Sequence, residues 1–364
     1  MISLYNPYIS KNTLKNVSNC IKQNWISSKG SYVKKFEKSF SKFTKIKYSI
    51  SVSNGTCAMH IALLSLGIKK NDEVIVPSFT YVASSNPIKY VGAKPVFVDS
   101  DQETLQIDVK KIEKKINSKT RAIICPHLYG NMTDMDYLVK LKKKYKLFLI
   151  EDCAESFGSY YKKKHSGNFG EISTFSFYGN KTITTGEGGM VCTNNKKIAN
   201  LAFKLKTQGA MRNVHPYYHD VIGYNYRMTN ICAAIGVSQL EDAKFIIKTK
   251  KQIFKQYEKN IKINKKIKLL KESNNVSSSY WLIVIILENK FIKRRLEKFL
   301  NNNSIETRPT FYPLHKLPIY HTHQKIKVAE KLGTCGICLP SYPGIKINEI
   351  QYISKKINQF IYEV

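Results

Sequence analysis

Short apolar runs alternate with amphipathic stretches between about residues 51 and 194. The apolar runs have the length and composition of buried strands, and they are Glu73–Val76, Pro95–Val98, Ala122–Cys125, Leu147–Ile150 and Thr174–Phe177. The stretches between them carry apolar residues at helical spacing, over Thr56–Leu66, Asp108–Ile116 and Thr133–Tyr145. Asp108 is a candidate N-cap for the second helix, and Thr133 or Asp134 for the third. This alternation predicts an α/β fold with a large, mostly parallel sheet covered by helices.

The pattern changes after Gln208. Residues 209–230 are rich in Gly, Tyr, His and Asn and predict a long ordered loop, followed by a helix from about Asn230 to Lys250. The remainder combines helices, an apolar strand at Tyr280–Leu287 and turns marked by Pro and Gly, which is typical of a smaller α+β domain. We therefore predict a large domain over residues 1–250 and a small C-terminal domain over 251–364.

The chain is strongly basic. Its 59 Lys and Arg residues outnumber 26 Asp and Glu residues, for a formal net charge of +33 at pH 7. A basic surface that binds polyanions is one interpretation. However, the lysines are spread over the whole chain among many Asn, Ile and Tyr residues. This distribution favours the interpretation that the excess of lysine reflects overall composition and that these side chains are solvated. The positive electrostatic field of so basic a chain still favours an anionic substrate. We expect no nucleic-acid partner.

No apolar segment is long enough to span a membrane, since the longest strongly apolar run is Tyr280–Leu287. We find no signal sequence and expect a soluble, cytoplasmic protein. The eight cysteines are dispersed in apolar contexts, as free thiols in a reducing compartment are. Cys335-Gly-Ile-Cys338 has the spacing of a half metal site, but without a second pair we favour packing.

Two candidate sites fall next to predicted strands. In Ser53-Asn-Gly-Thr-Cys57, Gly55 permits a tight turn, and the N–H groups of Thr56 and Cys57 could bind an anion at a helix start. An ordinary loop-to-helix turn is the alternative. The strand Leu147-Phe-Leu-Ile-Glu-Asp152 ends in two carboxylates, one of which could hold a positively charged ring nitrogen. A capping or salt-bridging Asp152 is the competing interpretation.

The third candidate is Lys181, in the segment Phe175-Ser-Phe-Tyr-Gly-Asn-Lys-Thr-Ile-Thr-Thr-Gly-Glu-Gly-Gly-Met190. A lysine that is buried in a loop of small residues can lose its proton and form imines, whereas a solvated loop lysine would stay charged. In α/β sheets, ligands bind at the carboxyl ends of strands and at helix N-termini. The order and positions of the three segments are therefore more specific than any one of them.

Taken together, these segments resemble the DegT/DnrJ/EryC1/StrS sugar aminotransferases, and within that family most of all the perosamine and viosamine synthases. The resemblance covers nearly the whole chain, and it is strongest over Phe177–Met190, Gly223–Asn230 and Ile305–His315. It implies the aspartate-aminotransferase fold (fold type I) and pyridoxal 5'-phosphate (PLP) as cofactor.

The resemblance also implies a role for each matching residue. Lys181 corresponds to the lysine that forms the Schiff base, and Asp152 to the carboxylate that keeps the pyridine nitrogen protonated. A phosphate cradle corresponds to Gly55, Thr56, Cys57 and Ser176, and an aromatic side chain stacked on the ring corresponds to Tyr81. Glu155 corresponds to a residue near the ring hydroxyl, and Asn225 or Arg227 to a phosphate ligand from a partner subunit. Arg308 and His315 correspond to substrate-proximal residues. A purely structural His315, packed in a turn, is an equally good interpretation.

The reaction that the resemblance implies is transfer of an amino group from L-glutamate to C4 of a GDP- or dTDP-linked 4-keto-6-deoxyhexose, in a homodimer with shared active sites. A 3-keto-sugar aminotransferase is the nearest alternative, and a PLP-fold regulator that binds nucleic acid a remote one. Relatives that are dehydratases have histidine in place of the lysine, so Lys181 argues against that branch. Two departures matter: position 57 is a cysteine, and Met211–His219 is a variable loop that leaves the nucleotide and the sugar open.

Overall fold

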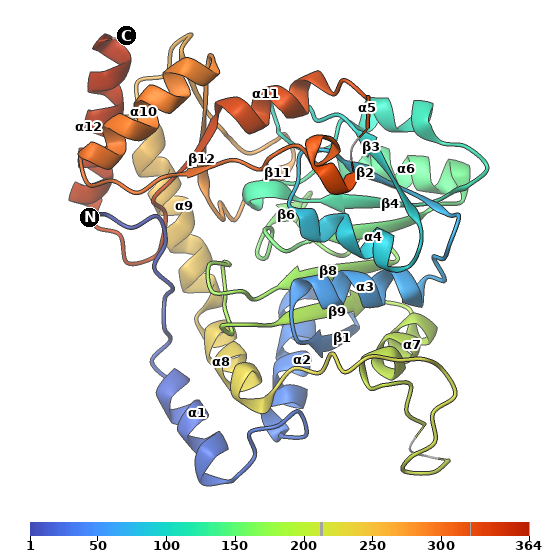
Figure 1. Ribbon diagram of the computed structural model, residues 1–364. Helices are drawn as coiled ribbons and strands as arrows, with labels where there is room; N and C mark the ends of the chain where they lie inside the picture. The colour runs from blue at the N-terminus through green and yellow to red at the C-terminus, as the bar shows by residue number, and fades with distance from the viewer. Residues whose placement is uncertain (212–213, 321, 364) are drawn as a thin grey trace.

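The large sheet is mostly parallel, as predicted. The computed structural model describes residues 1–211, 214–320 and 322–363. Seven strands form the sheet in the order β1-β9-β8-β5-β4-β2-β3, which Figure 1 shows stacked from bottom to top. Strands β8, β5, β4, β2 and β3 are parallel, and β9 is antiparallel to both of its neighbours. The strands are β1 (Tyr48–Val52), β2 (Glu73–Pro77), β3 (Lys94–Val98), β4 (Thr120–Pro126), β5 (Phe148–Asp152), β8 (Ile172–Ser176) and β9 (Gly189–Thr193).

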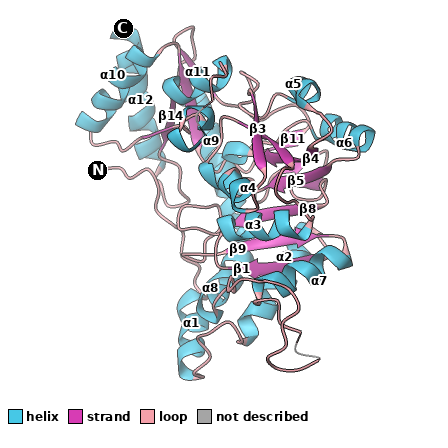
Figure 2. Cartoon of the chain, turned by 45° about the vertical axis from the view of Figure 1, so that its right-hand side comes forward, coloured by secondary structure: helices cyan, strands magenta, loops and turns pink. Residues whose placement is uncertain are grey.

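Both faces of this sheet are buried, which explains why its strands are continuous apolar runs. In β2, Val74 and Val76 belong to the core beneath α3 (Gly55–Ser65), while Ile75 between them belongs to the core beneath α6 (Met135–Tyr145). Figure 2 shows helices on both sides of the strands. The other helices of this part are α1 (Thr13–Lys22), α2 (Ser31–Thr44), α4 (Asn86–Tyr90), α5 (Val109–Ile112) and α7 (Lys196–Lys206), with 3₁₀ turns η1 (Val82–Ser84), η2 (Glu113–Lys115) and η3 (Leu128–Gly130).

The predicted caps are present at two helices. The Asp108 side chain accepts a hydrogen bond from the Lys110 N–H at the start of α5. Asp134, rather than Thr133, caps α6 by accepting from the Tyr137 N–H. The helix expected over Asp108–Ile116 is shorter than predicted, because α5 gives way to the 3₁₀ turn η2.

The single helix expected over Asn230–Lys250 is wrong: the segment forms α8 (Asn230–Glu241) and α9 (Ala243–Asn260). The break is at Asp242. Its carboxylate accepts hydrogen bonds from Tyr8 Oη at 3.1 Å and Ser10 Oγ at 2.6 Å, both in the N-terminal segment. Contacts with a distant part of the chain thus end α8, and periodicity within the helix does not reveal them.

A second, antiparallel sheet lies in the C-terminal part, in the order β10-β12-β14-β13. Its strands are β10 (Ile267–Leu269), β12 (Ile283–Leu287), β13 (Arg308–Pro309) and β14 (Gly336–Leu339). The helices around it are α10 (Lys290–Asn302), α11 (Lys327–Cys335) and α12 (Ile347–Glu363), with turns η4 (Leu314–Lys316) and η5 (Pro318–Tyr320). In Figure 1, α10 and α12 lie at the upper left, beside both chain ends.

The strand predicted from Tyr280 begins three residues later, at Ile283. Tyr280 has a φ of 49°, a left-handed conformation that a strand does not accommodate. Two further strand pairings connect segments that are far apart in the chain. Ile2 bridges to Ile305, and a small third sheet pairs β11 (Val276–Ser277) with β6 (Tyr160–Tyr161), which in turn pairs with β7 (Lys164–His165). The division at residue 250, which falls inside α9, stays a prediction.

Two predictions from composition can be compared with this fold. Cys335 and Cys338 are buried and free, and Cys338 lies in the main core, as packed thiols do. No described helix is both long enough and apolar enough to cross a membrane.

Candidate functional site

A cavity of about 740 Å³ opens where the carboxyl ends of β5 and β8 meet the N-terminus of α3. This is the edge of the sheet at which α/β folds bind ligands. Segments from the C-terminal part close its other side, including Trp281 and Arg308. The wall contains eight of the predicted site residues: Gly55, Thr56, Tyr81, Asp152, Glu155, Ser176, Lys181 and Arg308.

Lys181 is presented by a tightly folded loop between β8 and β9. The loop is closed by backbone hydrogen bonds from the Phe177 N–H to the Gly188 carbonyl and from the Thr185 N–H to the Phe177 carbonyl. Thr184 adds a side-chain bond to the same carbonyl at 3.0 Å. Small residues and hydroxyls therefore hold the loop, which leaves the lysine side chain free to point into the cavity.

The Lys181 amine is buried among charged groups. Its Nζ lies 3.6 Å from Glu155 Oε1 and 4.1 Å from the centroid of the Trp281 ring. Burial lowers the pKa of Lys181, and Arg308 adds to that effect, while Glu155 and Asp152 oppose it. Burial also raises the pKa of Glu155 to about 7, against the influence of Lys181. The result is an amine that is easier to deprotonate than a surface lysine, which nucleophilic chemistry at carbonyl groups needs.

Asp152 ends β5 and faces the cavity. Its Oδ2 accepts a hydrogen bond from Ser84 Oγ at 2.7 Å, and its Oδ1 accepts one from the Ala154 N–H at 3.1 Å. These two neighbours fix the orientation of the carboxylate but leave acceptor capacity on it. A protonated ring nitrogen is a suitable partner for such a group.

The predicted phosphate cradle is only partly as expected. Gly55 and Thr56 begin α3, so their N–H groups have no intrahelical acceptor. A Cβ on Gly55 would lie 2.9 Å from the Cβ of Ser176, so only glycine allows this close approach. The Cys57 N–H, however, donates to Asn54 Oδ1 at 2.8 Å, and Cys57 does not line the cavity. A phosphate would fit against Gly55, Thr56 and Ser176.

Aromatic side chains cover the cavity, and sequence reasoning found only one of them. Tyr81 is 58% exposed, with its ring centroid 5.9 Å from that of Phe311. Trp281 was missed, because the apolar run Tyr280–Leu287 predicted only a strand. Its indole N–H donates to the Asn180 carbonyl at 2.6 Å, which ties it to the Lys181 loop. The one available signal was a tryptophan at the second position of that run.

Besides Cys57, three predicted residues do not line this cavity. His315 is fully buried, with Nδ1 2.6 Å from Ser78 Oγ and Nε2 3.1 Å from Glu330 Oε1, so both ring nitrogens are used within the fold. This geometry matches the interpretation of a packed turn histidine. Arg227 donates to Asn225 Oδ1 from Nε at 3.0 Å and from Nη2 at 2.8 Å. Neither Asn225 nor Arg227 lines the cavity of its own chain. In the variable loop Met211–His219, Arg212 and Asn213 lie outside the described residues.

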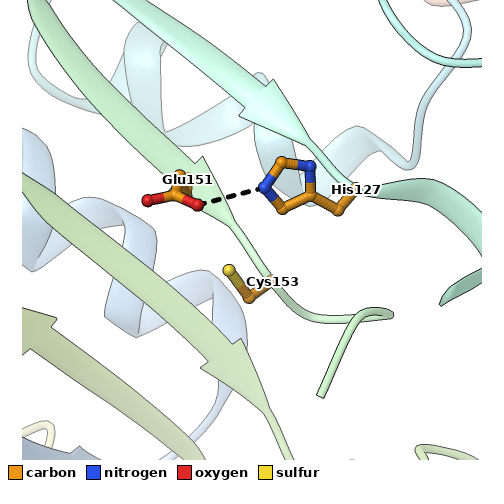
Figure 3. Close-up of side chains that lie close together, drawn as sticks. All are labelled: His127, Glu151 and Cys153. Carbon is orange, nitrogen blue, oxygen red and sulfur yellow. Dashed lines mark hydrogen bonds and ion pairs between the residues drawn. The ribbon is translucent and has the colours of Figure 1, made fainter. Parts of the chain in front are cut away.

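A second polar group lies under the sheet, on the other face of β5 from Asp152. His127, Glu151 and Cys153 are fully buried, with one potential ligand atom from each within 4.8 Å of the others (Figure 3). The oxygens of Glu151 are already occupied. Oε1 accepts from the Phe169 and Gly170 N–H groups, and Oε2 accepts from the Gly167 N–H at 2.8 Å and lies 3.2 Å from His127 Nε2. We therefore interpret this group as a structural network rather than a metal site.

The charges of this network support each other. Although burial alone would lower it, the pKa of His127 is raised to about 10 by Cys125 and Glu151. The pKa of Glu151 is lowered despite its burial, because His127 and the N–H groups of the 167–170 turn stabilise the carboxylate. Glu151, held by His127 and by the N–H groups of the 167–170 turn, thus anchors that turn beneath the strand that carries Asp152.

Comparison with known proteins agrees with this site. Residues 7–358 match the DegT/DnrJ/EryC1/StrS aminotransferase family. The chain is 52% identical to GDP-perosamine synthase of Escherichia coli O157:H7 (99% of this chain, 98% of the relative) and 46% identical to GDP-perosamine synthase of Vibrio cholerae (99% of each). A Streptococcus pneumoniae protein described as a sugar aminotransferase, solved in its pyridoxamine-phosphate form, superposes with a TM-score of 0.94 at 26% identity, covering 100% of this chain and 98% of that one. This chain therefore belongs to the DegT/DnrJ/EryC1/StrS aminotransferase family and is a PLP-dependent sugar aminotransferase of fold type I.

Proposed function

We propose that this protein transfers the amino group of L-glutamate to C4 of a GDP-linked 4-keto-6-deoxyhexose and yields a perosamine-type 4-amino-4,6-dideoxyhexose. The names of the E. coli and V. cholerae relatives support GDP and this sugar type. The observation that carries the proposal is the single cavity in which Lys181, Asp152 and Glu155 meet beside the glycine start of α3. A dTDP-linked sugar and a 3-keto sugar are the alternatives to be tested.

The residues of the cavity fit PLP. Gly55, Thr56 and Ser176 would hold the phosphate, Asp152 the protonated ring nitrogen, Glu155 the region of the ring hydroxyl, and Tyr81 one face of the ring. When bound, PLP supplies an electron sink that stabilises the charge left on the donor's α-carbon after its proton leaves. Lys181 would hold the cofactor covalently, and its amine, when free, would take that proton and return it.

Two further residues shape the chemistry around Lys181. Trp281 lies over the amine, with its ring centroid 4.1 Å from Nζ, and is part of the surroundings that bury it; this burial lowers the pKa of Lys181. Arg308 lies on β13 with its guanidinium 5.8 Å from the Trp281 ring, and we assign it to an anionic group of the donor or of the sugar nucleotide. In the second half of the reaction, the same Lys181 amine returns a proton to the sugar carbon that receives nitrogen.

The test combines product analysis with a variant. The purified protein, given L-glutamate and either GDP- or dTDP-4-keto-6-deoxyhexose, is expected to aminate the GDP-linked sugar at C4, as seen by NMR of the product. Lys181→Ala should lose turnover by at least about a thousandfold, while Lys197→Ala, at an exposed lysine of α7, should not. An amine at C3, or preference for dTDP, would replace the corresponding part of the proposal. Turnover that survives in Lys181→Ala would remove its basis.

A further inference from the structure

Lys250 is a fully buried lysine outside the cavity. It lies on α9 and is 1% exposed. Its Nζ donates to the Trp281 carbonyl at 2.7 Å, to the Ser341 carbonyl and to Ser341 Oγ at 3.3 Å. In the part of the chain that the structure describes, no carboxylate forms an ion pair with it. The ammonium thus joins a helix to two separate segments, the one before β12 and the one after β14.

A lysine in this position is costly to a stable core. Burial of an ammonium without a counter-ion disfavours the charged form, and it lowers the pKa of Lys250 to about 7. An apolar side chain of similar length would avoid that cost. The three neutral oxygens around Nζ offset part of the cost of burying Lys250. We therefore look for the function of this contact in the segments that carry those oxygens, around Trp281 and Ser341.

Two of the groups next to Lys250 also contact Lys181. Trp281, whose carbonyl accepts from Lys250, places its ring over the Lys181 amine and its indole N–H on the Asn180 carbonyl. Tyr5, whose ring centroid is 5.7 Å from Lys250 Nζ, donates its hydroxyl hydrogen to the Lys181 carbonyl at 2.6 Å. One contact acts at the side chain of Lys181 and the other at its backbone.

We propose that Lys250 is a positioning residue, whose buried Nζ group donates to the Trp281 carbonyl and holds this backbone so that the indole covers Lys181 and confines its amine to the cofactor cavity. The inference rests on the proposed role of Lys181. Trp281 needs such an anchor because it follows Tyr280, which has a left-handed φ of 49°, and precedes the first residue of β12 by two positions. Without the bond from Lys250, its carbonyl has lost the donor that fixes this irregular segment.

The chain allows a direct measurement of this contact, because it has only two tryptophans. Trp25 is 50% exposed and Trp281 2% exposed, so in a Trp25→Phe background the emission reports on Trp281 alone. In the full-length protein before cofactor is added, Lys250→Met should shift that emission to longer wavelength and make it more accessible to acrylamide. With cofactor and substrates present, kcat should fall about tenfold to a hundredfold while KM changes by less than about threefold.

Two variants accompany Lys250→Met. Lys248→Met removes an exposed lysine from the same helix and should leave both the emission and kcat at wild-type values. Lys250→Arg keeps a charge and several donors, and should restore both readouts toward the wild type. Urea unfolding, followed by circular dichroism, establishes that each variant is folded. If Lys250→Met does not unfold cooperatively, Lys250→Gln takes its place under the same criteria, since its amide is uncharged and one atom shorter.

The outcomes separate the inference from the proposed function. A folded Lys250 variant with wild-type Trp281 emission and wild-type kcat would overturn the positioning role. So would a variant that lowers kcat no more than Lys248→Met does. A failure of the proposed function appears elsewhere, as turnover in Lys181→Ala, and does not alter what the Trp281 emission reports about Lys250.

Discussion

At the scale of single residues, the chemistry depends on how each charge changes its neighbours. Sequence motifs indicated Lys181, Asp152 and Glu155 as candidate site residues, but they could not give the distances between these side chains. The 3.6 Å between Lys181 Nζ and Glu155 Oε1 makes the two titrations interdependent. Because burial raises the pKa of Glu155 to about 7, its carboxylate forms only as the pH rises through that value, and only then does it stabilise the Lys181 ammonium.

Glu155→Gln removes that stabilisation, so the pKa of Lys181 should fall further. We expect the variant, freed of cofactor, to capture added PLP roughly threefold to tenfold faster than the wild type at pH 8, where wild-type Glu155 is ionised. At pH 6, where Glu155 is mostly neutral, the two rates should agree. Stopped-flow absorbance of PLP measures both. Equal rates at pH 8, or the same difference at both pH values, would contradict this assignment.

At the scale of elements, β5 serves two purposes through its alternating side chains. Asp152 faces the cavity, while Glu151, one residue earlier, anchors the 167–170 turn together with His127. Alternation along a strand requires that neighbours face opposite sides. The pair Glu151-Asp152 taken alone leaves open which carboxylate belongs to the site; the family resemblance indicated Asp152, and Asp152 is the one that lines the cavity.

Glu151→Gln should lower the free energy of unfolding by about 3 kcal/mol at pH 6, because it leaves His127 without its carboxylate. The raised His127 pKa contributes stability that is complete below the unfolded value of 6.5 and is lost as the pH rises through about 10. The lowered Glu151 pKa contributes stability that is present above its unfolded value of 4.5 and is lost as the pH falls. The difference in the free energy of unfolding between variant and wild type, measured with urea, should therefore be larger at pH 6 than at pH 9.5. A gap that is independent of pH would exclude an ionic pair.

At the scale of the whole molecule, the cavity lacks one expected contributor. Asn225 and Arg227 form a bonded pair away from the cavity of their own chain, beside a segment with exposed apolar residues such as Tyr217 and Ile222. This arrangement suits a surface that reaches the site of a second copy, and we propose that the protein forms a homodimer in which it does so. Such a contact between copies conserves two-fold symmetry, so each copy would complete the site of the other.

Mixed dimers test this sharing. Lys181→Ala lacks its own lysine, and the double variant Asn225→Ala, Arg227→Ala lacks the pair that would reach across. A mixed dimer of the two contains one intact site, so equal random mixing should restore about a quarter of wild-type activity. Each variant on its own should be far less active, and the double variant should bind PLP more weakly. Activity of the mixture no higher than the mean of the two separate variants would show that the sites are not shared.

The sequence by itself determined the α/β fold and the five buried strands, because strand periodicity is a local property of the chain, and its resemblance to a known family indicated Lys181 as a candidate. It also identified Asp152 and the glycine start of α3. Only the tertiary structure decided that Trp281 covers the lysine and that His315 packs in the core. It likewise broke the helix expected over Asn230–Lys250 at Asp242, through Tyr8 and Ser10. These outcomes depend on contacts between residues far apart in the chain, which burial and hydrogen bonding select only once the whole molecule has folded.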